Sequence, residues 1–95
     1  MRTIVAFDIS NDRVRARVVK ALLGRGQRVQ KSVFELPDLR RAAYVRLRSE
    51  LEGLVDPNTD SLRYYRVCAS CADRIECYGV GPGLVRGQLA FEVID

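Results

Sequence analysis

A single carboxylate stands at the point where an apolar stretch of this sequence ends and a charged stretch begins. Asp8 follows the run TIVAF at residues 3–7, which is typical of a strand covered on at least one face, and Ser10 or Asn11 can then cap a helix. In α/β architectures the carboxyl end of a strand exposes its side chain to a crevice, and carboxylates are preferred ligands of Mg²⁺. Asp8 is therefore a candidate metal ligand. The same position also suits a structural role, in which Asp8 accepts hydrogen bonds from the backbone of the turn.

The sequence contains no histidine. This excludes Ser/His and Cys/His nucleophilic centres, histidine general bases and histidine-containing metal sites. Carboxylate chemistry remains, but metal-assisted phosphodiester cleavage needs one or two ions held by several oxygens, and one aspartate supplies too few of them. A symmetric dimer with Asp8 near its two-fold axis would bring two copies of this carboxylate together. The sequence permits that arrangement without establishing it.

Basic residues are concentrated in the first half of the chain. Residues 1–48 contain twelve Lys or Arg and four Asp or Glu, a net charge of +8, while residues 49–95 contain four and eight, a net charge of −4. Fourteen of the sixteen basic residues are arginines, whose planar guanidinium matches phosphate oxygens in a bidentate way. The pattern is consistent with a nucleic-acid partner and equally with a solvated, arginine-rich surface.

Three cysteines, Cys68, Cys71 and Cys77, lie in the second half of the chain. An odd number does not make a disulfide framework, and the absence of a long apolar run or a signal-like start predicts a cytoplasmic protein with reduced thiols. The spacing CASC at 68–71 suggests zinc, but a tetrahedral site needs four ligands and the chain offers three sulfurs and no imidazole. We therefore expect thiols, with a zinc site shared across a dimer as the alternative.

Strand and helix patterns alternate along the chain. The first helix ends near Gly24, and residues 28–36 form one bent strand or two short strands. Pro37 and Asp38 then open a second helix, which ends at Gly53 and has apolar residues at every fourth position. The two helices are thus expected to bury one stripe each.

A further strand pattern at 62–68 follows a loop at 56–61. The order strand, helix, strand, strand, helix, strand is that of a ferredoxin-like βαββαβ fold of the α+β class. We expect a single domain of residues 1–95, with its core at about 1–78 and an added C-terminal strand at about 84–95. This fold hosts many unrelated activities, so it does not by itself give a function.

The first helix has two distinct faces. At about 100° per residue, its apolar stripe holds Val14, Val18, Ala21 and Leu22, and the opposite stripe holds Arg13, Arg17 and Lys20. Arg15 falls near the edge of the apolar stripe, so its side chain is expected to run along the protein body before it reaches water.

Several segments together resemble a known family. The segment FDIS at 7–10 is followed by Arg15 and Arg17, then by GRGQRVQKSVFEL at 24–36 and DPNTDSLRYYRVC at 56–68. Along essentially the whole chain they resemble the small CRISPR-associated endonuclease known as the second Cas protein. The resemblance implies a ferredoxin-like homodimer in which the C-terminal strand of each copy adds to the sheet of the other.

The resemblance also implies roles for individual residues. It identifies Asp8 as the catalytic, metal-binding aspartate, with Mg²⁺ as the cofactor. The other implied positions are nucleic-acid-binding arginines at Arg15, Arg17 and Arg28, and supporting residues at Phe7, Ser32 and Phe34. Position 7 is often tyrosine in the family, so phenylalanine here keeps the ring and loses the hydroxyl.

The implied function is Mg²⁺-dependent cleavage of single-stranded RNA or double-stranded DNA during spacer acquisition in antiviral defence, with the integrase known as the first Cas protein as a partner. One alternative is a non-catalytic dimeric scaffold that bridges integrase dimers and binds protospacer DNA. That alternative fits a chain with one candidate ligand and no histidine. A third alternative, a regulatory module that binds a small metabolite, fits the fold but explains the arginine excess poorly.

Overall fold

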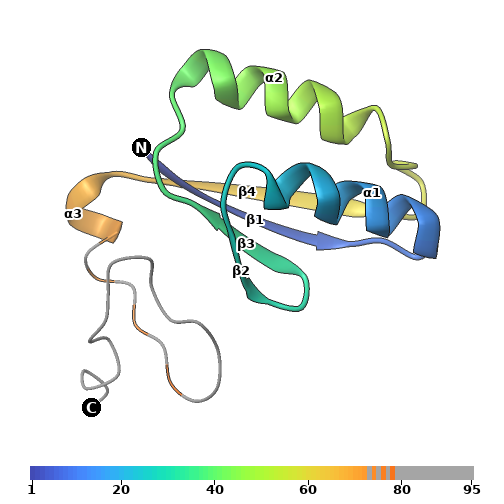
Figure 1. Ribbon diagram of the computed structural model, residues 1–95, viewed down its shortest axis with the longest axis horizontal. Coiled ribbons are helices and arrows are strands. Elements are labelled where there is room, and N and C mark those ends of the chain that lie inside the picture. Colours follow the sequence, from blue (N-terminus) through green and yellow to red (C-terminus); the bar gives the residue numbers. More distant parts are fainter. Residues whose placement is uncertain (73, 75, 77, 79–95) are drawn as a thin grey trace.

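Four strands, two long helices and one short helix make up the part of the chain that the computed structural model describes, which is residues 1–72, 74, 76 and 78 (Figure 1). In chain order they are β1 (Arg2–Asp8), α1 (Asp12–Leu23), β2 (Gln27–Gln30), β3 (Val33–Leu36), α2 (Arg41–Glu52), β4 (Ser61–Val67) and α3 (Ala69–Ala72). The predicted C-terminal strand at about 84–95 lies outside the described residues.

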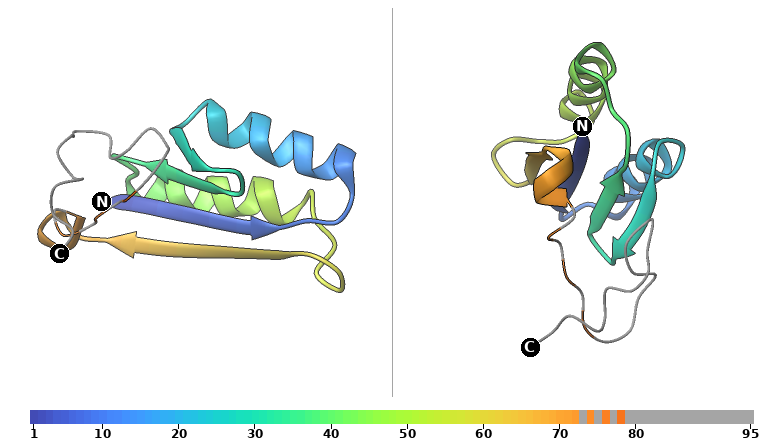
Figure 2. Two further views of the ribbon diagram at one scale, coloured as in Figure 1. Left: turned by 90° about the horizontal axis from the view of Figure 1, so that it is seen from below. Right: turned by 90° about the vertical axis from the view of Figure 1, so that its left-hand side faces the viewer.

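The four strands form one antiparallel sheet in the order β2-β3-β1-β4. This order, with one helix between β1 and β2 and another between β3 and β4, is that of the ferredoxin-like fold, so the predicted fold class is confirmed. Figure 2 shows that α1 and α2 both lie on one face of the sheet. The central strand β1 therefore runs beneath the helices, and its carboxyl end lies beside the start of α1 (Figure 1).

Strand β1 alternates between the two faces of the sheet. Thr3, Val5 and Phe7 are buried on the helix side, whereas Ile4 and Ala6 point to the other side and are partly exposed. The alternation stops where the core stops, because the last residue of the strand is charged and exposed. The strand thus delivers a carboxylate to the surface next to a helix start.

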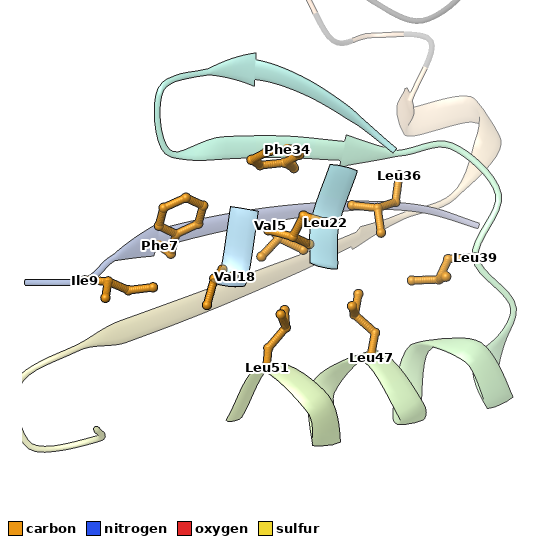
Figure 3. Packing of buried hydrophobic residues seen from close by; sticks show 10 residues of the cluster. All are labelled: Val5, Phe7, Ile9, Val18, Leu22, Phe34, Leu36, Leu39, Leu47 and Leu51. Atoms are coloured by element: carbon orange, nitrogen blue, oxygen red, sulfur yellow. The ribbon is translucent and has the colours of Figure 1, made fainter. Parts of the chain in front are cut away.

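The two long helices supply the apolar stripes that the sequence predicted. Val18 and Leu22 of α1 and Leu47 and Leu51 of α2 are buried, and they meet sheet residues such as Phe34 in one core (Figure 3). Burial of each such side chain contributes about 1.5–3 kcal/mol. This packing fixes the position of α1 above β1 and β3.

The start of α1 is capped as predicted. The side-chain oxygen of Asn11 accepts hydrogen bonds from the backbone N–H groups of Arg13 (2.9 Å) and Val14 (3.0 Å). Asp12 adds a negative charge in the first turn, where the helix dipole favours it. The helix ends at Leu23, with Gly24 as its C-cap.

The start of α2 differs from the prediction. The helix begins at Arg41, after the expected opening at Pro37 and Asp38. The backbone of Arg40 is still extended (φ −75°, ψ 164°). The reason is a contact distant in sequence: the carbonyl oxygen of Leu39, which an earlier helix would pair with the N–H of Ala43, accepts from Arg66 Nη2 at 2.9 Å. The Leu39 N–H also donates to the carbonyl oxygen of Met1 at 3.0 Å, so the segment is tied to the sheet and the helix starts only beyond it.

The alternatives for residues 28–36 are also resolved. The structure has two strands, β2 and β3, joined by a turn at Lys31 and Ser32, with an irregular register between Arg28 and Gln30. This turn lies near the carboxyl end of β1. None of the helices in the described part of the chain is long and apolar enough to span a membrane.

Candidate functional site

A groove of about 710 Å³ lies between α1 and the sheet, at the carboxyl end of β1. Five of the seven predicted site residues line it: Phe7, Asp8, Arg15, Arg28 and Ser32. Asp12, Lys20 and Lys31 complete its charged lining, and Ile9, Val19 and Leu23 contribute apolar wall. The tertiary structure therefore brings together residues that come from three separate elements of the chain.

Asp8 is exposed where β1 ends and is paired across the sheet with Ser61 of β4. The turn that follows is held by other side chains, because Asn11 caps α1 and the backbone N–H of Ser10 donates to Asp60 at 3.2 Å. In residues 1–72 no hydrogen bond or ion pair engages the Asp8 carboxylate. The structural role considered for Asp8 is thus performed by Asn11 and Asp60, and its carboxylate remains open to a ligand.

Arg15 runs along the protein body, as its place at the edge of the apolar stripe predicted. Its Nη1 donates to the carbonyl oxygen of Ile9 at 2.6 Å, and its Nη2 bonds to the carboxylate of Asp12. Ile9 directly follows Asp8, so this clasp fixes the backbone beside the candidate ligand. A guanidinium has five N–H donors, and the side chain is 38% exposed, so Arg15 retains donors for a phosphate.

Arg28 makes a similar clasp on the other wall. Its Nε and Nη2 donate to the carbonyl oxygen of Lys31 at 3.1 and 2.7 Å, which holds the turn between β2 and β3. Its guanidinium carbon lies 5.6 Å from the centre of the Phe34 ring, within cation–π range. The backbone N–H of Phe7 donates to the carbonyl oxygen of Ser32 at 3.1 Å. The turn is therefore fastened to the end of β1.

Two predicted residues do not line the groove. Phe34 is fully buried, and its ring stacks on that of Phe7 with centroids 6.3 Å apart, so it supports the groove from within the core. Arg17 is exposed on α1 and is absent from the groove lining. The resemblance implied a role for each residue, but it did not distinguish lining residues from supporting ones.

Sequence reasoning missed three charged lining residues: Asp12, Lys20 and Lys31. Lys20 was expected on the outer stripe of the first helix, but it lines the groove from the flank of α1. Asp12, Ala16 and Lys20 follow one another at intervals of four residues, so they share one face of the helix. This spacing is the signal that could have predicted Lys20 as a lining residue. Lys31 carried only a weaker signal, its position beside Ser32 in the chain.

The groove carries a net positive charge, because four basic and two acidic side chains line it: Arg15, Lys20, Arg28 and Lys31 against Asp8 and Asp12. Asp12 is already paired with Arg15. The arrangement therefore presents one open carboxylate among cations, which suits a phosphate ligand accompanied by a metal ion.

Mg²⁺ is commonly bound by one or two carboxylates together with water and phosphate oxygens. Asp8 beside four basic side chains fits that donor set. The described residues contain no group of three or more Cys, Asp or Glu side chains that could hold a metal. A metal at Asp8 would thus need oxygens from a substrate, from water or from a second copy of the chain.

Comparison with known proteins identifies the family. The family model described as CRISPR associated protein Cas2 matches residues 1–75. A relative from Chloroflexus aurantiacus, named CRISPR-associated endoribonuclease Cas2 1, is 49% identical over 80 residues, which cover 83% of this chain and 85% of that protein.

Solved structures agree with this assignment. Cas2 from Streptococcus pyogenes at pH 6.5 superposes with a TM-score of 0.74 at 31% identity, covering 83% of this chain and 100% of that one. A chain from a partial Cas6-RT-Cas1–Cas2 complex superposes with a TM-score of 0.68 at 22% identity, covering 80% of this chain and 88% of that one. The second likeness concerns the fold alone.

Proposed function

Since this chain belongs to the CRISPR-associated protein Cas2 family, we propose that it is a Mg²⁺-dependent endonuclease of spacer acquisition, which hydrolyses phosphodiester bonds in single-stranded RNA or double-stranded DNA for antiviral defence. The observation that carries the proposal is the open Asp8 carboxylate in a groove lined by four basic side chains. The names of the curated relatives, which are endoribonucleases, support a nuclease.

Asp8 is the residue that would hold the metal, together with Asp8 of a second copy in a homodimer. Mg²⁺ bound there supplies electrostatic stabilisation of the phosphate and lowers the pKa of water. Ser32 and the Asp12 carboxylate border the same groove, but Asp12 is paired with Arg15. We therefore assign the ligand role to Asp8 alone within each chain.

The basic residues of the groove bind the phosphate backbone. Lys20 and Lys31 contribute ammonium groups on flexible side chains. Arg15 and Arg28 contribute their remaining guanidinium N–H donors, whose directions are fixed. Arg15 and Arg28 also keep the two loops of the groove in place through their bonds to Ile9 and Lys31. Arg15 and Arg28 thus combine binding with positioning, whereas the two lysines serve binding alone.

A non-catalytic scaffold is the second candidate. It is favoured by the single open carboxylate per chain and by the absence of histidine. In this alternative the homodimer uses its basic surface to hold protospacer DNA between integrase dimers, and Asp8 has no chemical role. The name of the complex that contains a Cas1–Cas2 assembly motivates an integrase partner, although that likeness itself concerns only the fold.

The test is cleavage of labelled single-stranded RNA and double-stranded DNA with Mg²⁺ and with chelator, by wild type and by Asp8→Asn. We expect cleavage to require Mg²⁺ and to fall about 100-fold or more in the variant, as when a group that stabilises transition-state charge is lost. Asp38→Asn is the matched control, because it removes an equal charge from an exposed aspartate outside the groove.

Cleavage that is equal in wild type and Asp8→Asn would contradict the catalytic role. Retained nucleic-acid binding without metal-dependent cleavage in wild type would support the scaffold instead. Circular dichroism and the oligomeric state of each variant confirm that the comparison is between folded proteins. The substrate that is cleaved names the preferred nucleic acid.

A further inference from the structure

A second pair of chemically active side chains lies away from the groove. Cys68 follows the last residue of β4, and Cys71 is the third residue of α3. Both are exposed free thiols. Figure 1 shows α3 at the end of the sheet opposite to the carboxyl end of β1, so this pair is separate from the site that contains Asp8.

The two thiols are neighbours across one helical turn. Residues three apart in such a turn have Cα atoms about 5 Å apart, and a disulfide accepts Cα separations of about 4.4–6.8 Å. The hydroxyl of Ser70 lies 3.4 Å from the sulfur of Cys68. The turn therefore places the two cysteines at a separation that an internal disulfide can span.

The two thiols also differ in acidity. The hydrogen bond from Ser70, followed by those from Cys71, lowers the pKa of Cys68 to about 7. The neighbouring Cys68 sulfur raises the pKa of Cys71. A thiol that is partly ionised at neutral pH is the better attacking group, and its neighbour is suited to resolve the mixed disulfide that results.

We propose that Cys68 and Cys71 form a reversible dithiol–disulfide site that exchanges with low-molecular-weight disulfides. The Cys68 thiolate attacks one sulfur of the small disulfide, forms a mixed disulfide and releases one small thiolate. Cys71 loses its proton to solvent and attacks the Cys68 sulfur, which forms the Cys68–Cys71 bond and releases the second small thiolate. The protein loses two electrons and two protons, and the small disulfide gains both as two thiols.

The internal bond would tie the end of the edge strand β4 to the first turn of α3. It would close a ring of four residues in which only Ala69 and Ser70 lie between the cysteines. This site does not depend on nucleic-acid cleavage, so the inference stands or falls separately from the proposed function.

The experiment exposes the full-length protein to oxidised glutathione at pH 7.5, followed by alkylation, trypsin digestion without reductant and mass spectrometry. Trypsin cleaves after Arg66 and Arg74, so both cysteines fall in the peptide of residues 67–74, while Cys77 falls in the next one. We expect the 67–74 peptide to be lighter by two hydrogens than its reduced form, and reduced glutathione to reverse the change. Cys77→Ser should behave as wild type.

Two variants in the Cys77→Ser background test the order of attack. Cys71→Ser should accumulate a mixed disulfide on Cys68, whereas Cys68→Ser should form one on Cys71 about 2–3-fold more slowly, because Cys71 lacks the Ser70 hydrogen bond that favours the Cys68 thiolate. Equal rates in the two variants would overturn the assigned roles. A cross-link between the 67–74 peptide and the Cys77 peptide, a disulfide between two chains, or an unchanged 67–74 peptide would overturn the site.

Discussion

Asp60 shows how one side chain can set the geometry of two loops. Its carboxylate accepts hydrogen bonds from the backbone N–H of Asp56 at 3.0 Å and of Ser10 at 3.2 Å, and from the hydroxyl of Thr59 at 3.2 Å. The loop before β4 is thereby fastened to the loop between Asp8 and α1. The Asp56 N–H, and to a smaller extent the Ser10 N–H, lower the pKa of Asp60 from its ordinary value of 3.8.

This shift predicts a pH-dependent contribution to stability. The ionised form accepts the bonds, so the contribution is present above the unfolded-state pKa and is lost as the pH falls through the lower folded-state pKa. Asp60→Asn should therefore lower the urea midpoint of unfolding at pH 7, and the difference from wild type should shrink below about pH 4. Urea titrations of both proteins across this range measure it.

Thr59→Val provides the control for Asp60, because it keeps the carboxylate and both backbone bonds. Its difference from wild type should not change with pH in the same way. A midpoint difference between Asp60→Asn and wild type that is constant from pH 7 to pH 3 would contradict the assigned role of the carboxylate.

At the scale of the elements, the first residue before β2 controls how closely two strands approach. A Cβ atom on Gly26 would lie 2.3 Å from the carbonyl oxygen of Glu35 and 2.9 Å from the Cα of Leu36. Both are backbone atoms of β3, so the clash cannot be relieved by a side-chain rotation. The same strand pair carries Arg28 and the turn that forms one wall of the groove.

Gly26→Ala should consequently lower the free energy of unfolding by about 1–3 kcal/mol, the range for overpacking in a well-packed region. It should also weaken nucleic-acid binding, because the wall of the groove shifts. Gly24→Ala is the matched control, since its Cβ would lie 3.8 Å from the carbonyl oxygen of Ala21, which is an ordinary van der Waals contact. Equal unfolding midpoints for the two variants would show that β2 tolerates the displacement.

At the scale of the whole molecule, the charge of the first half of the chain is distributed over both helices and the groove. Binding of nucleic acid through the groove predicts a steep dependence on salt. Lys20→Ala combined with Lys31→Ala should reduce the slope of log K against log salt for duplex DNA by about 1.8, because each phosphate contact contributes about 0.9. Fluorescence anisotropy at several salt concentrations measures the slope.

The control for the lysine pair is Arg41→Ala combined with Arg46→Ala. These residues are exposed on α2 and do not line the groove, yet their loss changes the net charge by the same amount. If the control reduces the slope as much as the groove variant does, general attraction rather than the groove binds the nucleic acid. A slope near zero for wild type would remove the phosphate-binding role from all of these side chains.

The proposed homodimer gives a separate prediction. If the two Asp8 carboxylates act together, a dimer of one wild-type and one Asp8→Asn chain should be inactive. At equal total protein, wild type refolded with an equal amount of the variant should then show about one quarter of the metal-dependent cleavage of pure wild type, the share of dimers with two intact chains under random assembly. Retention of about one half would mean that each Asp8 acts alone.

The sequence by itself determined the order of the four strands and the two long helices, the α+β class and the placement of Asp8 at the end of β1, whereas helix α3 was not predicted. These features depend on local patterns: the apolar alternation of β1, the cap at Asn11 and the glycines that end both long helices. The start of α2 escaped prediction because the Leu39 carbonyl oxygen bonds to Arg66, a partner remote in sequence. The family resemblance added the candidate site residues, but not their arrangement.

Only the tertiary structure decided how those residues are arranged in the groove. Arg15 and Arg28 donate to the carbonyl oxygens of Ile9 and Lys31, and these contacts cannot be read from the chain. Lys20 enters the groove because the packing of α1 on the sheet turns its flank toward the turn between β2 and β3. The physical reason is that a site is built from contacts between elements, whereas sequence patterns report the preferences within one element.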